Sequence, residues 1–262
     1  MNQKRVLVTG AGSGIGKEFT RLFLRDGSRV LAVSLLQDEL DRLQSEFDQT
    51  GGRLQTLQMD LSASDAAERL LTGCEQNGWI PDILINNAGF VCFGEALNLP
   101  LDRVESMIAL NVLTLTKTSI LFGRKMRERG HGRILNVGST AGMVPSQRMA
   151  AYCASKSYVN TFSFALAAEL AASGVTVTCL TPGATATNFA KAGQIDQFAG
   201  RSMLKDMFAQ GKVGSAAAVA AAGYHGLLQG RRHVLVGKGS SLAAWMSRLF
   251  SPSVLPGLIK DV

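Results

Sequence analysis

Residues 5–16 read RVLVTGAGSGIG, and this stretch decides the fold. Its first part, Arg5–Thr9, is a short aliphatic run of the kind found in a strand buried on both faces. A glycine-rich turn follows, and Lys17–Arg25 is predicted to be helical. Glycines let the backbone turn sharply and approach a ligand closely, and the free N–H groups at the start of a helix favour a pyrophosphate. The order of strand, turn and helix therefore predicts a dinucleotide site, with a ligand-free turn as the alternative.

The same pattern of short apolar runs and amphipathic stretches continues along the chain. Strands are predicted at Arg29–Ser34, Leu54–Met59, Ile83–Ile85, Ile134–Val137, Val175–Leu180 and His233–Val236, and helices at Asp38–Phe47 and near residues 101–128, 151–172 and 215–228. This alternation predicts an α/β fold, a single Rossmann-type, doubly wound parallel sheet with helices on both faces. No linker or change in composition divides the chain. We therefore expect residues 1–240 to form one catalytic domain and residues 241–262 a C-terminal extension.

Composition excludes several classes of protein. The chain has 262 residues, of which 46% are hydrophobic and 18% charged, so a large core can form and disorder is excluded as the main state. The 27 Lys and Arg residues outnumber the 20 Asp and Glu residues by seven, but they are spread along the chain, so we expect no nucleic-acid partner. The three histidines and four cysteines do not have metal-site spacing, which predicts no metal and reduced thiols in a cytoplasmic protein. We also expect no signal peptide and no membrane-spanning helix, because long apolar runs are lacking.

Two residues of the predicted helix over residues 151–172 form a candidate acid–base pair. Tyr152 and Lys156 are four residues apart, which places them on one face of a helix. A free tyrosine has a pKa of about 10 and is a poor base at neutral pH, but a nearby ammonium stabilises the phenolate and lowers this pKa. The pair can therefore act as an acid and a base. Taken alone, the same spacing is more often a surface pair.

Two polar residues elsewhere have positions that invite a functional interpretation. Ser139 directly follows the strand that contains Ile134–Val137, and the carboxyl ends of parallel strands face the ligand crevice. Asn111 lies inside an otherwise helical stretch, although asparagine is a mediocre helix former. Each has a plain structural alternative, a turn-capping serine and a core-bonded amide.

In their order and spacing, Asn111, Ser139, Tyr152 and Lys156 resemble the catalytic tetrad of the short-chain dehydrogenase/reductase family in its compact form. The spacing of Gly10, Gly14 and Gly16 is similar to the glycine motif of that family. The resemblance implies that Ser139 hydrogen-bonds the substrate oxygen and that Tyr152 donates or accepts the proton. It also implies that Lys156 holds the nicotinamide ribose and that Asn111 positions a water in the proton relay.

Three further segments resemble cofactor-binding elements of the family. Residues 86–89 (NNAG) correspond to the element near the adenosine ribose, residues 60–61 to the aspartate turn that contacts adenine, and residues 182–187 (PGATAT) to the turn that holds the carboxamide. The resemblance therefore implies NADP or NAD as cofactor. It implies contacts from Gly10, Ser13, Gly14, Ile15, Gly16, Ser34, Asp60, Leu61, Asn87, Ala88, Gly89, Tyr152, Lys156, Pro182, Gly183, Thr185 and Thr187.

The choice between the two nucleotides depends on the end of the second predicted strand. NAD enzymes usually carry an acidic residue there, which bonds the ribose hydroxyls. The strand ends in Ser34 followed by Leu35, and Asp38 is too far along to serve. The absence of a repelling carboxylate favours NADP slightly, with Ser34 as a donor and Lys17 and Arg42 as candidates for its phosphate.

The resemblance also locates a substrate pocket lined by Phe90, Val91, Phe93, Met143, Val144 and Phe189. An apolar lining predicts a hydrophobic alcohol and its ketone or aldehyde as substrates, although these side chains can equally belong to the core. The chain is thus expected to be an NAD(P)-dependent oxidoreductase. The alternative is a nucleotide-binding regulatory protein on the same fold with little or no catalysis.

Beyond the last predicted strand, five apolar residues fall on one helical stripe: Leu242, Trp245, Met246, Leu249 and Phe250. We expect this tail to cover the domain or a partner subunit, with peripheral contact to a membrane surface as the alternative. Relatives often associate through the helix that carries the tyrosine, so a homodimer or homotetramer is expected.

Overall fold

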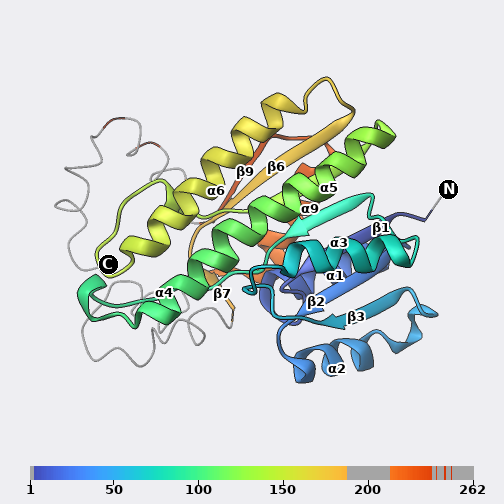
Figure 1. Ribbon diagram of the computed structural model, residues 1–262, viewed down its shortest axis with the longest axis horizontal. Coiled ribbons are helices and arrows are strands. Elements are labelled where there is room, and N and C mark those ends of the chain that lie inside the picture. Colours follow the sequence, from blue (N-terminus) through green and yellow to red (C-terminus); the bar gives the residue numbers. More distant parts are fainter. Residues whose placement is uncertain (1–2, 188–212, 238–239, 241–244, 246–248, 250–262) are drawn as a thin grey trace.

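The computed structural model describes residues 3–187 and 213–237, together with residues 240, 245 and 249. A seven-stranded sheet with strand order β3-β2-β1-β4-β5-β6-β9 forms its centre, and every pairing in it is parallel (Figure 1). The strands are β1 (Arg5–Thr9), β2 (Arg29–Ser34), β3 (Leu54–Gln58), β4 (Ile83–Asn86), β5 (Gly132–Val137), β6 (Val175–Pro182) and β9 (His233–Val236). The predicted doubly wound sheet is confirmed, with strand ends within two residues of expectation.

Helices lie on both sides of this sheet (Figure 1). They are α1 (Gly14–Arg25), α2 (Gln37–Glu46), α3 (Ala66–Gln76), α4 (Leu101–Ile108), α5 (Leu115–Arg129), α6 (Ala150–Glu169) and α9 (Ala216–Leu228). A π-helical turn over Ala109–Thr114 joins α4 to α5, and β7 (Thr185–Ala186) pairs with β8 (Gly214–Ser215) in a small parallel sheet. Short 3₁₀ turns lie at Asp48–Thr50, Ala96–Asn98 and Thr140–Gly142.

The continuous apolar run of β1 is explained by its burial on both faces. Val6 and Val8 join a cluster with Phe19 of α1, while Leu7 joins a second cluster with Phe122 of α5. Successive strand residues point to opposite faces, so both sets must be apolar when helices cover both sides. This packing sets β1 at the middle of the molecule, where the glycine turn begins.

The strand order reverses between β1 and β4. From β1 the chain proceeds outward to β2 and β3, and it then returns to place β4 on the other side of β1. In open parallel sheets, ligands bind at the carboxyl ends of the strands beside such a reversal. The fold therefore sets the expected site at the ends of β1, β4 and β5.

The stretch Leu101–Arg129 is long and apolar enough to cross a membrane by length and composition, with a mean hydropathy of 1.3. It contains α4, the π-helical turn and α5, and its Phe122 and Met126 are buried in the second core cluster. A core helix of an α/β domain passes the same test. The absence of a spanning helix stays a prediction.

Candidate active site

The glycine turn has the backbone shape that its sequence predicts. Gly10 and Gly14 have φ angles of 62° and 54°, in the left-handed region that favours glycine. A side chain at Gly16 would collide with the carbonyl oxygen of Gly10, so the start of α1 packs directly on the turn. The Ser13 side chain, which precedes α1, makes no capping hydrogen bond within the described part of the chain. The turn and the N-terminus of α1 therefore form a cradle that suits a pyrophosphate.

The NNAG loop is tied to the end of β1 by hydrogen bonds. The Thr9 hydroxyl accepts from the backbone N–H groups of Asn87 and Ala88, at 3.0 Å each, and donates to the Ile85 carbonyl. The Asn87 side-chain amide donates to the carbonyls of Thr9 and Gly10. Asn87, expected beside the adenosine ribose, thus holds the glycine turn in place with its side chain.

Asn111 lies in the π-helical turn, and its amide is fully buried. Its Oδ1 accepts from the Phe90 N–H at 3.1 Å, and its Nδ2 donates to the Phe90 carbonyl and to Ser155 Oγ. A side chain at Gly89 would lie 2.7 Å from Asn111 Oδ1 and 3.6 Å from Lys156 Nζ. Gly89, Asn111 and Lys156 therefore lie close together. The helix predicted near residues 101–128 is confirmed as a helical run from Leu101 to Arg129, which widens into a π turn at this asparagine.

Ser139 follows β5 and begins the 3₁₀ turn Thr140–Gly142. Its Oγ accepts from the Ala141 N–H at 3.1 Å, and its carbonyl accepts from Asn160 of α6. The Ser139 hydroxyl also hydrogen-bonds the Tyr152 phenol, an interaction that lowers the pKa of the phenol. The serine and the tyrosine are thus brought together from β5 and α6.

Tyr152 and Lys156 are both buried on α6, with 6% and 4% of their surface exposed. Lys156 Nζ donates to the Val137 carbonyl at 2.8 Å and lies 6.0 Å from the centroid of the Tyr152 ring. Burial lowers the pKa of Lys156 to about 8. Burial also raises the pKa of Tyr152 well above its ordinary value, against the smaller effect of Ser139. In the protein alone the net change in the pKa of this phenol is therefore upward, opposite to the expected lowering, because desolvation of the phenolate dominates.

The turn after β3, which contains Asp60 and Leu61, is held by hydrogen bonds to both residues. The Asp60 carboxylate accepts from the N–H of Ser62 at 2.8 Å and from its hydroxyl at 2.6 Å. The Leu61 carbonyl accepts from Thr114 Oγ1, which ties this loop to the π-helical turn. The carboxylate of Asp60, the predicted adenine contact, is thus hydrogen-bonded within its own loop.

The PG turn closes over the glycine turn. The Gly183 N–H donates to the Val236 carbonyl at 2.7 Å, and Thr185 Oγ1 donates to the Gly183 carbonyl. A side chain at Gly14 would lie 3.0 Å from Thr187 Cβ. Pro182 ends β6, and the turn after it brings Thr187 to the start of α1.

Sequence reasoning missed Glu39, whose carboxylate lies at the end of β2. Ser34 Oγ donates to Glu39 Oε2 at 3.1 Å, and a side chain at Gly12 would collide with the same oxygen. The prediction that no acid stands at this strand end is therefore wrong. Glu39 occupies the third position of α2, from which a glutamate commonly turns back toward the residues before its helix. That position in the sequence is the signal that could have found it.

The predicted phosphate contact Lys17 has another partner. Its Nζ lies 2.6 Å from Glu46 Oε2, and the pair is completed by Arg21, which also contacts Glu46. Arg42 is exposed on α2. The Lys17 ammonium is therefore neutralised by a carboxylate of α2 in this structure.

The predicted substrate pocket divides into two kinds of residue. Val91 and Phe93 are buried with Tyr152 in a third apolar cluster, and Val144 is 6% exposed, so these three pack the wall instead of lining open space. Phe90 and Met143 keep part of their surface accessible. Phe189 lies outside the described residues. Of the five predicted pocket residues that are described, three therefore belong to the core, which is the alternative prediction for these side chains.

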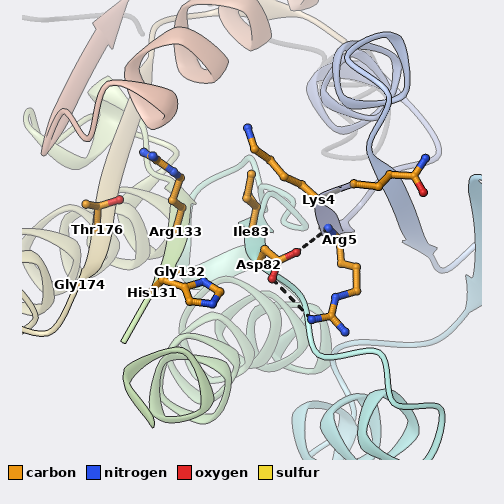
Figure 2. Close-up of a pocket in the computed structure, with 10 residues that line it drawn as sticks. Lys4, Arg5, Asp82, Ile83, His131, Gly132, Arg133, Gly174 and Thr176 are labelled. Carbon is orange, nitrogen blue, oxygen red and sulfur yellow. Dashed lines mark hydrogen bonds and ion pairs between the residues drawn. The ribbon is translucent and has the colours of Figure 1, made fainter. Parts of the chain in front are cut away.

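A hollow of about 620 Å³ lies at the other edge of the sheet (Figure 2). Its lining comes from the amino ends of the strands and the loops before them: Gln3, Lys4, Arg5, Asp82, Ile83, His131, Gly132, Arg133, Gly174 and Thr176. None of these residues belongs to the tetrad or to the cofactor elements. Across the described residues, no group of three or more His, Cys, Asp or Glu side chains could hold a metal ion.

Comparison with known proteins agrees with this geometry, a parallel sheet whose glycine turn and Ser-Tyr-Lys group share its carboxyl edge. The chain belongs to the short chain dehydrogenase family, whose model matches residues 4–197. It is 36% identical over 179 residues to the NADP-dependent 3-hydroxy acid dehydrogenase YdfG of Escherichia coli (strain K12), covering 68% of this chain and 71% of that protein. It is 35% identical over 184 residues to the probable oxidoreductase EphD of Mycobacterium tuberculosis (strain ATCC 25618 / H37Rv), covering 70% of this chain but only 31% of EphD.

Solved structures give the same picture. A short-chain dehydrogenase from Sphingobium yanoikuyae in complex with NADPH has a TM-score of 0.78 at 27% identity, covering 99% of this chain and 96% of that chain. A serine dehydrogenase complexed with NADP⁺ has a TM-score of 0.78 at 30% identity, covering 89% of this chain and 94% of that one. The predicted family is confirmed.

Proposed function

We propose that this protein is an NAD(P)-dependent oxidoreductase that interconverts a hydrophobic alcohol and its ketone or aldehyde, with Tyr152 as the acid–base group. The observation that carries the proposal is the convergence of Ser139, Tyr152 and Lys156 beside Gly89 and Asn111 at the carboxyl edge of the sheet. The nucleotide-bound relatives support the same chemistry.

The chain provides a bed that fits a nicotinamide dinucleotide. The glycine turn and the N-terminus of α1 suit the pyrophosphate. A side chain at Gly10 or Gly16 would collide with the NNAG loop or with the turn itself, so glycine is needed for this turn to form. Gly89 lies next to Lys156 Nζ, the ammonium that would hold a ribose hydroxyl, and a side chain at this position would collide with Asn111 Oδ1. When bound, the nucleotide supplies or accepts the hydride. The protein must then orient the substrate and manage the charge on its oxygen.

Ser139 and Tyr152 are the groups that would meet the substrate oxygen. In the reducing direction, the Ser139 hydroxyl would hydrogen-bond this oxygen while Tyr152 delivers a proton to it. Burial raises the pKa of Tyr152, so the phenol is protonated at neutral pH and ready to donate. In the oxidising direction, the phenolate must accept the proton, and the Lys156 ammonium is the nearby cation that would stabilise it.

The substrate class is inferred from the wall around the tetrad. Phe90 and Met143 offer accessible apolar surface next to a wall formed by Val91 and Phe93. Small-molecule sites are mostly apolar with a few convergent polar groups, and Ser139 and Tyr152 are those groups here. We therefore propose a hydrophobic carbonyl or alcohol as the small-molecule partner.

A homodimer or homotetramer is part of the proposal. Several apolar side chains on α4, the π-helical turn, α5 and α6 are at least one-third exposed: Ile108, Leu113, Ile120, Tyr158 and Phe164. Tyr158 stacks on Phe162 and its hydroxyl accepts a hydrogen bond from Thr116 Oγ1, which joins α6 to α5 at this surface. Sedimentation of the purified protein tests this association, and a monomer at micromolar concentration would refute it.

The division into a domain over residues 1–240 and an extension over residues 241–262 also remains a proposal. Of the predicted apolar stripe, Trp245 and Leu249 are described and are 58% and 57% exposed, and the other three residues lie outside the described part. Deleting residues 241–262 and measuring sedimentation and liposome binding would distinguish a subunit contact from a membrane contact. We propose a cytoplasmic setting, in keeping with four cysteines that are all buried and unpaired.

The proposed function is tested with a panel of carbonyl and alcohol compounds, each assayed with both nucleotides by absorbance of the reduced cofactor. We expect turnover with hydrophobic members of the panel. Nucleotide binding without turnover of any compound would favour the regulatory alternative, and failure to bind either nucleotide would overturn the proposal.

A further inference from the structure

We propose that Glu39 makes this protein select NAD(H) over NADP(H), by placing a carboxylate where the 2′ position of the adenosine ribose would lie. The inference rests on the proposed function, because it concerns the same nucleotide site. It reverses the slight preference for NADP that the sequence suggests. The selectivity is assigned to Glu39 of α2 because the strand-end residue, Ser34, carries no charge and cannot repel a phosphate.

The first argument is the position of the carboxylate. Glu39 belongs to the first turn of α2, yet its side chain returns to the end of β2, where Ser34 Oγ donates to Oε2 at 3.1 Å. A side chain at Gly12 would lie 2.5 Å from Glu39 Cβ and 2.9 Å from Ser34 Oγ. The carboxylate thus rests against both the glycine turn and the end of the second strand.

The second argument is what these two elements do in a dinucleotide fold. The glycine turn receives the pyrophosphate, and an acidic residue about 20 positions further on, at the end of the second strand, bonds the ribose 2′-hydroxyl. Glu39 is the carboxylate that the structure brings to that place. A carboxylate accepts a hydrogen bond from a hydroxyl group, but it repels a phosphate at the same position.

The third argument is the charge around Glu39. Lys17, a cation near the turn, is paired with Glu46 at 2.6 Å. Ser13 in the turn and Leu35 after β2 are uncharged. Within the described residues, no salt bridge reaches Glu39. Its negative charge is therefore uncompensated where the additional phosphate of NADP would have to lie.

A structural explanation of the same contact must be separated from this one. A glutamate at the third position of a helix can simply hold the helix start through its bond with Ser34. Glu39→Gln distinguishes the two roles, because the amide keeps the shape and can still accept from Ser34 Oγ while the charge is lost. Asp38→Asn is the matched control, since it removes one charge from the neighbouring, exposed position of α2.

The experiment titrates the full chain with NADH and with NADPH, in the absence of substrate, and follows the fluorescence of the reduced nicotinamide. We expect the wild-type protein to bind NADH about 10- to 100-fold more tightly than NADPH, because like charges in partly desolvated sites repel strongly. Glu39→Gln should reduce this ratio at least about fivefold, chiefly by strengthening NADPH binding, whereas Asp38→Asn should change it by less than about twofold.

Tighter or equal binding of NADPH by the wild-type protein would overturn the inference. So would a ratio that Glu39→Gln leaves unchanged, provided that its thermal unfolding matches that of the wild type. Either result would leave the proposed function standing, because a nucleotide still binds. Failure of both nucleotides to bind would instead overturn the proposed function and the inference with it.

Discussion

The two edges of the central sheet carry polar side chains of similar kinds but use them differently. At the amino edge, which Figure 2 shows, Asp82 is paired with Arg5 and with Arg129 at 3.6 Å each. The Arg133 guanidinium donates to the carbonyls of Leu227 and Leu228 at the end of α9. These charges are bound to the chain itself, so this edge holds strands and helices together.

At the carboxyl edge, polar groups from β5, the π-helical turn and α6 converge with the glycine turn. Gly10, Gly14 and Gly89 allow the glycine turn, the PG turn and the NNAG loop to pack closely beside the start of α1. Tyr152 and Lys156 are buried although each is an ionisable group, which burial penalises in its charged form. The edge proposed to bind a ligand thus buries ionisable groups whose charged forms are destabilised by desolvation. The structural edge instead pairs its charged groups with one another and with backbone carbonyls. Variants at the carboxyl edge should therefore change catalysis, and variants at the amino edge should change stability.

A large effect, smaller than that of removing the Tyr152 hydroxyl, is expected from Ser139→Ala at the carboxyl edge. Removing the hydroxyl that bonds the phenol and would bond the substrate oxygen should lower turnover by roughly 10²- to 10³-fold. The dissociation constant of the nucleotide and the melting temperature should stay close to wild type. Ser106→Ala, on the exposed side of α4, is the control. A loss below about fivefold would contradict the assignment of Ser139.

A second effect concerns the ionisation of Lys156 in the nucleotide-free protein. Because burial lowers its pKa to about 8 from an ordinary value of 10.5, its ammonium should lose the proton in mildly alkaline solution. The folded state then binds fewer protons than the unfolded state between these pKa values, so burial of this lysine costs stability below pH 8 and the cost fades as the pH rises. Carbon-13 shifts of labelled lysine side chains, with Lys156→Met for assignment, measure the titration. A midpoint above pH 10 would show that burial does not destabilise the Lys156 ammonium.

At the amino edge, Asp82→Ala should lower the free energy of unfolding by about 1–2 kcal/mol. Its carboxylate accepts from the Arg5 N–H at 2.8 Å and pairs with two guanidinium groups, all of which lose a partner. Turnover per folded molecule should not change. Denaturant unfolding measures the loss, and Asp82→Asn, which keeps an acceptor, should lose less than half as much. A fall in turnover without a fall in stability would break the comparison between the edges.

The smallest effect is expected from Thr176→Val, also at the amino edge. In the described structure the buried Thr176 Oγ1 has no hydrogen-bond partner, so replacing the hydroxyl by a methyl group of similar size should raise stability by about 0–1 kcal/mol. Thermal unfolding measures this change, and turnover is the control. A clear loss of stability would mean that this hydroxyl is hydrogen-bonded in solution.

The parts of the site that sequence predicts are those in which backbone shape or spacing demands a residue type. Gly10 and Gly14 require positive φ angles, and the four-residue spacing of Tyr152 and Lys156 follows from the helical repeat. These demands are local, so they can be read without coordinates. The same holds for the strands, whose apolar runs reflect helices packed on both faces.

The parts that sequence misses depend on where side chains turn and how deeply they are buried. Glu39 reaches the end of β2 only because its side chain folds back from α2. The direction of the pKa change at Tyr152 depends on desolvation, which spacing does not reveal. Val91 and Phe93 are apolar in sequence whether they line a pocket or fill the wall behind it. Each of these outcomes is decided by tertiary packing.

The most direct test of the central claim is the turnover of Tyr152→Phe, measured beside its dissociation constant for the nucleotide. We predict that turnover falls by roughly 10²- to 10⁴-fold while nucleotide binding stays within about twofold of wild type, because only the proton-donating hydroxyl is lost and the glycine turn and the α1 N-terminus are unchanged. Turnover at the wild-type rate in this variant would contradict the account.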